Sequence, residues 1–161
     1  MDELKTNKLN FVFLTMEGTF FFFGLTFLDA NTVIPVFIDS FTGSLQIAGL
    51  ANTLRLILTL LPQLLIGPYV SNIKNLPSFI FKVMIIFRPL FLLMVPILIS
   101  NPGSKASVIL FLIIYSLFWL CEGIISIPWW ELFSRTISND KRGKLLGCSC
   151  FSAALPVWQV A

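Results

Sequence analysis

The chain has 161 residues, of which 57% are hydrophobic and 12% are charged, and its formal net charge is +3. Soluble domains carry about 25% charged residues, and a soluble fold of this size could not bury so much apolar surface. We therefore expect an all-α, polytopic helical membrane protein embedded in a lipid bilayer. The net charge is too small to indicate nucleic-acid binding, so we interpret the basic residues as topology signals.

The residue types also exclude several kinds of catalytic and metal site. The chain has no histidine and three cysteines, Cys121, Cys148 and Cys150. An odd number of cysteines in apolar segments argues against a disulfide framework. Without histidine a His-containing triad cannot form, and the two neighbouring cysteines alone are too few for a zinc site. Paired-Glu and Gly-Asp protease motifs are absent as well, so we expect no enzyme, no cofactor and no metal.

The first predicted membrane span covers residues 11–38 and contains Glu17 and Asp29. A cleaved signal peptide is the alternative interpretation. It is disfavoured because the apolar stretch is too long and lacks a small-x-small cleavage site.

The second predicted span covers residues 46–69. Polar side chains recur along it at spacings of 3, 4 and 4, within about 80° of the helix wheel: Asn52, Arg55, Thr59 and Gln63. A single polar stripe on an apolar helix has to face protein or water, because facing lipid would be too costly.

The third predicted span, residues 78–100, holds Lys82 near its start and Arg88 deeper inside. The fourth, residues 108–133, carries a second stripe at spacings of 4, 3, 4 and 3: Tyr115, Trp119, Glu122, Ser126 and Trp129. A hydrophilic loop over 135–144 separates it from a fifth span, 145–161, which we expect the sequence to leave incomplete.

Basic residues predict the orientation of these spans. Seven lie in the N-terminal lead and in the second and fourth loops, namely Lys5, Lys8, Lys74, Arg135, Lys141, Arg142 and Lys144. The first and third loops carry only Lys105. This bias predicts a multi-pass protein of the cell membrane with a cytoplasmic N-terminus.

Five charges fall well inside the predicted spans: Glu17, Asp29, Arg55, Arg88 and Glu122. Each would cost about 2.5–3.5 kcal/mol if it faced lipid at mid-bilayer, so we expect them to face the bundle interior. Depths from a rise of ~1.5 Å per residue suggest pairing Asp29 with Arg55 and Arg88 with Glu122. Such pairs could simply hold the bundle together. For Arg55 and Glu122 we favour a polar pathway, because each lies within a longer stripe.

The end of the fourth span resembles the major facilitator superfamily of transporters. Many bacterial members have Pro-x-Trp at the end of their fourth helix, then a basic Arg-Gly loop, then a small residue. The matching residues here are Pro128, Trp129, Arg142, Gly143 and Gly147. A second match is Leu-Pro-Gln-Leu at 61–64 followed by Gly67, although Ser71 stands where the family's loop signature has Asp.

The resemblance implies an N-terminal portion, about five of twelve helices, of a secondary transporter that holds its substrate between two six-helix halves. The first, second and fourth helices would line the cavity, which needs the missing C-terminal half to be complete. An acidic residue on the first or fourth helix couples transport to protons in several members, and Asp29 and Glu122 occupy those helices here. The expected function is therefore transport of a small solute by alternating access, with proton coupling left open. The alternative is a truncated, non-transporting fragment or an accessory structural membrane subunit.

Overall fold

The computed structural model describes residues 2–29, 31–93, 95–96, 99 and 104–158. These residues form helices and no strand, as the composition predicts. Three of the helices are long and apolar enough to cross a membrane, and their candidate spans are Lys8–Thr26, Leu45–Asn72 and Lys105–Thr136. The chain divides into two compact units, Met1–Asp29 with Phe133–Ala161, and Ala30–Leu132, which we call the first and second unit.

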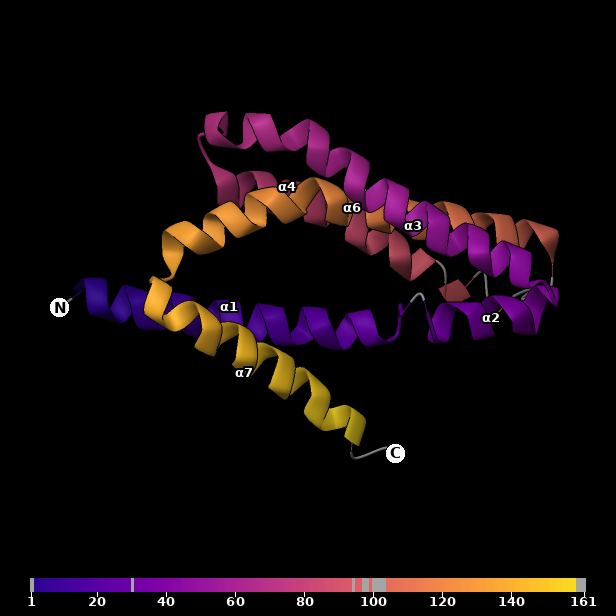
Figure 1. Ribbon diagram of the computed structural model, residues 1–161, viewed down its shortest axis with the longest axis horizontal. Coiled ribbons are helices and arrows are strands. Elements are labelled where there is room, and N and C mark those ends of the chain that lie inside the picture. Colours follow the sequence, from indigo (N-terminus) through magenta and orange to yellow (C-terminus); the bar gives the residue numbers. More distant parts are fainter. Residues whose placement is uncertain (1, 30, 94, 97–98, 100–103, 159–161) are drawn as a thin grey trace. The chain divides into compact units, whose positions relative to one another are not determined.

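In the first unit, helix α1 (Asp2–Thr26) lies beside helix α7 (Asn139–Trp158), as Figure 1 shows. The two helices meet through small side chains. Ser149 is buried, and its hydroxyl donates a 3.2 Å hydrogen bond to the carbonyl oxygen of Thr15. A Cβ atom on Gly18 would lie 2.9 Å from the Ser149 hydroxyl oxygen, so the glycine is what permits this close contact.

The second unit begins with α2 (Val33–Thr42), which contacts α3 (Leu45–Ile66). Gly43 joins them with a φ of 60°, a left-handed conformation that glycine adopts at little cost, and its N–H bonds to the carbonyl of Asp39. Two 3₁₀ helices and a further α-helix follow in chain order: η1 (Gly67–Asn72), α4 (Leu76–Phe87) and η2 (Arg88–Leu93).

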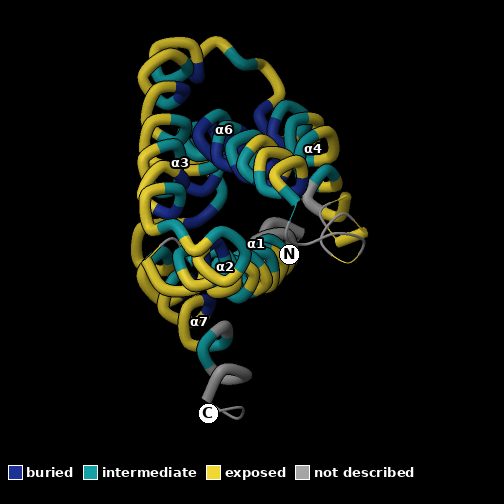
Figure 2. The backbone as a smooth tube through the Cα atoms, turned by 90° about the vertical axis from the view of Figure 1, so that its right-hand side faces the viewer, coloured by how far each residue is buried: buried dark blue, intermediate teal, exposed yellow. Residues whose placement is uncertain are grey.

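Helix α6 (Lys105–Thr136) supplies most of the buried side chains of the second unit. Figure 2 colours much of its length as buried, whereas α3 shows exposed residues along its whole length. The exposed residues of α3 include Leu56, Leu60 and Leu64, each at least half exposed. An apolar helix face of this kind suits contact with lipid or with further helices.

The expected span over 11–38 is not one helix in the structure. Helix α1 ends at Thr26 and α2 begins at Val33, and no described residue between them is helical. Pro35 falls in the first turn of α2, where the missing N–H would have no partner within the helix anyway. A proline expected to kink a long helix thus lies at the start of a new one.

The expected loop over 135–144 is also mostly helical. Helix α6 continues to Thr136 and α7 starts at Asn139, so only two residues separate them. Asp140 lies in the first turn of α7, where a negative charge interacts favourably with the helix dipole. The basic residues that follow are good helix formers, which lets the hydrophilic segment open the helix.

The other expected spans coincide with the helices to different extents. Span 46–69 lies within α3 and η1, and span 108–133 lies within α6. Span 78–100 is divided between α4 and η2, and part of its end lies outside the described residues. Span 145–161 lies in α7 up to Trp158, and residues 159–161 are outside the described part.

Candidate functional site

The stripe expected on the fourth span is largely an interior face of α6. Tyr115, Trp119 and Glu122 are all buried, and Ser126 and Trp129 are half-buried. Phe111 extends the stripe by one turn and stacks on Tyr115, with ring centroids 5.7 Å apart. A carboxylate in such an aromatic environment needs a partner that compensates its charge.

That partner is Arg88. Its Nη2 atom donates a 3.1 Å hydrogen bond to Oε1 of Glu122, forming a salt bridge between η2 and α6. The side chain of Glu122 is 10% exposed and that of Arg88 is 33% exposed, so the pair is shielded mainly on the carboxylate side. The depths of these two residues along their spans suggested this pairing.

Arg55 approaches the same part of α6 from α3. Its guanidinium carbon lies 4.8 Å from the centroid of the Trp119 ring, within the range of a cation–π contact. Trp119 and Glu122 are one helical turn apart, so Arg55 and Arg88 engage adjacent positions on one face of α6. Two guanidinium groups and one carboxylate therefore gather around these two residues.

The indole nitrogen of Trp119 adds an unused donor to this group. The residue is 8% exposed, and its Nε1 atom is buried without a hydrogen-bond partner among the described residues. A buried indole N–H usually has an acceptor, because leaving the donor unpaired is costly. The site thus has an excess of hydrogen-bond donors.

Helices α3 and α6 approach closely beside this group. A Cβ atom on Gly123 would stand 2.6 Å from the carbonyl oxygen of Thr59 and 2.7 Å from that of Leu58. Pro62 lies four residues after Leu58 and lacks the N–H that would bond to the Leu58 carbonyl. Gly123 did not emerge from the sequence, although small residues at helix contacts in membranes are a known signal that could have identified it.

Cys121 also contributes to this interior. The residue is fully buried, and its thiol lies 3.9 Å from the carbonyl oxygen of Val83 in α4. Cys148 and Cys150 are exposed on α7. Among the described residues no three Cys, Asp or Glu side chains come together as a metal ion would require.

The remaining residues of the two expected stripes contribute less directly. Asn52 and Gln63 are half-buried on α3, and the Thr59 hydroxyl donates a 2.7 Å bond back to the carbonyl of Arg55. The Ser126 hydroxyl likewise bonds within its own helix, to the carbonyl of Gly123. Glu17 and Asp29 belong to the first unit, so the pairing of Asp29 with Arg55 remains a prediction.

The residues that carry the family resemblance have local structural roles. Pro128 is fully buried inside α6, and the Trp129 and Trp130 rings contact each other edge to face with centroids 5.1 Å apart. Gly67 opens η1, whereas Gly143 and Gly147 lie within α7 with open space around them.

Arg142 closes the corner between α6 and α7. Its Nε atom donates to the carbonyl of Ile137 at 2.9 Å, and its Nη2 atom donates to the carbonyl of Ser134 at 2.6 Å. These carbonyls lie at the C-terminal end of α6, where the helix supplies no N–H partner and carries partial negative charge. Arg142 was expected in a loop motif and is instead a helix cap.

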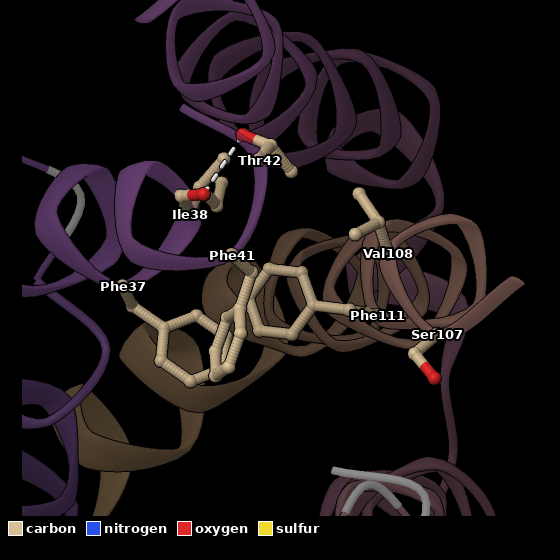
Figure 3. A pocket seen from close by; sticks show the side chains of 7 residues that line it. All are labelled: Phe37, Ile38, Phe41, Thr42, Ser107, Val108 and Phe111. Atoms are coloured by element: carbon tan, nitrogen blue, oxygen red, sulfur yellow. Dashed lines mark hydrogen bonds between the residues drawn. The ribbon is translucent and has the colours of Figure 1, made fainter. Parts of the chain in front are cut away.

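Two recesses of the second unit are apolar. One lies between α2 and α6 and encloses only about 10 Å³, with the rings of Phe37, Phe41 and Phe111 gathered at it (Figure 3). The other is a groove of about 330 Å³ between α3 and α6, lined almost entirely by leucine and isoleucine. Neither of these two recesses is lined by Arg55, Arg88 or Glu122.

Comparison with known proteins identifies no relative. No protein-family model matches the chain, and no curated protein or solved structure matches it.

Proposed function

We propose that the chain is the N-terminal portion of a major-facilitator-type transporter, which moves a small solute across the cell membrane by alternating access. The observation that carries the proposal is the Arg88–Glu122 salt bridge, with Arg55 beside it on the Trp119 ring. A structural ion pair alone would need neither the second arginine nor the aromatic stripe. Burying this many polar groups in candidate membrane helices is costly, and such groups are typical of substrate or ion pathways.

The placement of the charges on the helices supports the same function. Arg55 lies on α3 and Glu122 on α6, which correspond to the second and fourth helices that the family resemblance assigns to the cavity wall. The cavity of such a transporter lies between two six-helix halves, so in this proposal further helices complete it.

The salt bridge could control the change between the closed and open states of the transporter. A carboxylate and a guanidinium on two helical segments hold those segments together while both are charged. Separating η2 from α6 would expose Glu122 to water, where it could accept a proton, and closing would then require the proton to leave. Proton coupling through Glu122 is therefore the mechanism that we propose, with Asp29 as the second candidate carboxylate.

Uptake into vesicles tests the proposal. The full transporter, with the further helices that complete the cavity, would be reconstituted in vesicles that contain the pH indicator pyranine. A pH gradient would then be applied with glucose, tetraethylammonium or succinate outside. We expect at least one solute to drive proton movement, and Glu122→Gln to abolish the pH dependence. Asp39→Asn is the matched control, because Asp39 is an exposed carboxylate on α2.

Unchanged, pH-dependent flux in the Glu122 variant would refute coupling through this residue. Absence of flux with every solute, in a protein that remains helical and monodisperse, would instead favour the alternative of a non-transporting fragment or accessory subunit.

The orientation is proposed on the basis of the basic residues, with the N-terminus in the cytoplasm. A green fluorescent protein fused to the N-terminus should fluoresce, and alkaline phosphatase fused there should be inactive. The opposite pattern would refute the orientation.

A further inference from the structure

Within the described part of the second unit, Arg55 has no carboxylate partner of the kind that Arg88 has. It is half-buried on α3, and the contact of its guanidinium among the described residues of the second unit is with the Trp119 ring. The acidic side chain in this group, Glu122, is bonded to Arg88. The group therefore carries one more positive than negative charge.

The contact with the Trp119 ring leaves the hydrogen-bonding capacity of the Arg55 guanidinium largely available. The cation–π interaction engages its charge, whereas its five N–H donors remain able to bond to an acceptor. Bidentate binding of a carboxylate or phosphate is the interaction for which this planar group is best suited. A positive charge at membrane depth also requires a compensating charge.

Trp119 independently indicates a ligand that accepts hydrogen bonds. It is more than nine-tenths buried, and its Nε1–H, on the very ring that Arg55 covers, has no acceptor among the described residues. Both groups are donors and neither can accept a hydrogen bond. A ligand that satisfies both must present acceptors, and the net charge of the group favours an anion.

We infer that Arg55 and Trp119 bind the anionic group, a carboxylate or phosphate, of a soluble solute. This inference rests on the proposed transport function, and it assigns the substrate class as small organic anions. Arg55 neutralises the anion, and the indole N–H fixes the orientation of one of its oxygens. The bound solute would supply the negative charge that the group lacks.

Binding of radiolabelled succinate tests the inference without requiring transport. The protein in phosphatidylcholine nanodiscs would be assayed by scintillation proximity. We expect saturable binding that inorganic phosphate displaces and that succinamide, the uncharged analogue, does not.

Variants then assign the binding to the two residues. Loss of a charge-assisted hydrogen bond predicts that Arg55→Gln weakens succinate binding about tenfold or more. Arg55→Lys keeps the positive charge but lacks the planar guanidinium, so its affinity for succinate should lie between those of the wild type and Arg55→Gln. Trp119→Phe keeps an aromatic ring but loses the N–H donor, and it should weaken succinate binding about threefold. Lys82→Gln removes an exposed cation on α4 and should leave binding unchanged. Circular dichroism and gel filtration would establish that each variant is folded.

Several results would overturn the inference. These are equal affinity of wild type and Arg55→Gln, equal competition by succinamide, or no binding of any anion to the wild type. Displacement of succinate by phosphatidylglycerol in the nanodisc would assign the site to a lipid headgroup instead of a solute. Succinate binding without flux would support the anion site and refute the transport function. Flux of neutral solutes that Arg55→Gln leaves unchanged would support transport and refute the anion site.

Discussion

Gly123 of α6 lies so close to Thr59 of α3 that a Cβ atom on the glycine would stand 2.6 Å from the threonine carbonyl oxygen. The contact is backbone against backbone, so no flexible side chain can move aside. It lies next to Glu122 in the sequence and one turn from Trp119. The distance between α3 and α6 at the charged group therefore depends on the absence of a side chain at this position.

Replacing Gly123 by alanine should force the two helices apart. We expect a loss of about 1–3 kcal/mol in the free energy of unfolding, as is usual for overpacking. Denaturation in detergent micelles, followed by circular dichroism, would measure it. Gly49→Ala in α3 is the control, because nothing lies within 4 Å of a Cβ there, and it should be neutral or slightly stabilising. Equal effects of the two substitutions on the free energy of unfolding would show that the close contact at Gly123 does not determine stability.

Removing one member of the salt bridge should leave the other charge buried without compensation. Arg88→Gln or Glu122→Gln alone should cost about 1–3 kcal/mol, less than for a fully buried pair because Arg88 is 33% exposed. The double variant should lose clearly less stability than the sum of the two single variants. Additive losses in this double-mutant cycle would argue that the two side chains do not interact.

Arg142→Gln should loosen the corner between α6 and α7. Two hydrogen bonds to carbonyls at the end of α6 are lost, and partial exposure limits the expected cost to about 1–2 kcal/mol. Hydrogen exchange followed by mass spectrometry should become faster over residues 133–145. Lys141→Gln, which removes the neighbouring exposed charge, should leave exchange unchanged. Similar acceleration in both variants would indicate a general charge effect.

Asp140 predicts a pH dependence at the start of α7. A hydrogen bond from the Ser138 side chain, aided by its own backbone N–H and by Lys141 and Lys144, lowers the pKa of its carboxyl group below the ordinary value. A folded-state pKa below the unfolded one stabilises the fold above the unfolded pKa, and this contribution disappears as the pH falls through the folded pKa.

Asp140→Asn should therefore lower the melting temperature slightly at pH 7, and the difference from wild type should disappear as the pH falls through the lowered pKa of Asp140. Thermal melts at a series of pH values would measure it. A difference that persisted unchanged in acid would contradict the electrostatic origin.

Some of this structure could be predicted from the sequence, because apolar length and helix periodicity can be read directly from the order of the residues. Apolar length identified the helices over 46–69 and 108–133, and helix periodicity placed Tyr115, Trp119 and Glu122 on one buried face. Depth along the spans paired Arg88 with Glu122, since few positions in a membrane helix carry charge.

Other features depend on contacts that a residue pattern does not contain. The interruption after Thr26 was missed because residues 11–38 are almost continuously apolar, and hydrophobicity carries no information about where a helix restarts. Arg142 was interpreted as a topology charge and as part of the Arg-Gly loop motif, because its capping role depends on the three-dimensional course of the corner. Gly123 is neither polar nor charged, so the sequence pattern did not single it out, and its role depends on the absence of a side chain.

In the transporter that we propose, the link between Arg88 and Glu122 also bears on how the chain enters the bilayer. The two residues emerge from the ribosome 34 positions apart, Arg88 in η2 and Glu122 in α6. Either side chain alone would be a buried charge without compensation, at about 2.5–3.5 kcal/mol. When both side chains enter together, each charge compensates the other, so a substitution at Arg88 should lower the amount of protein that is inserted into the bilayer.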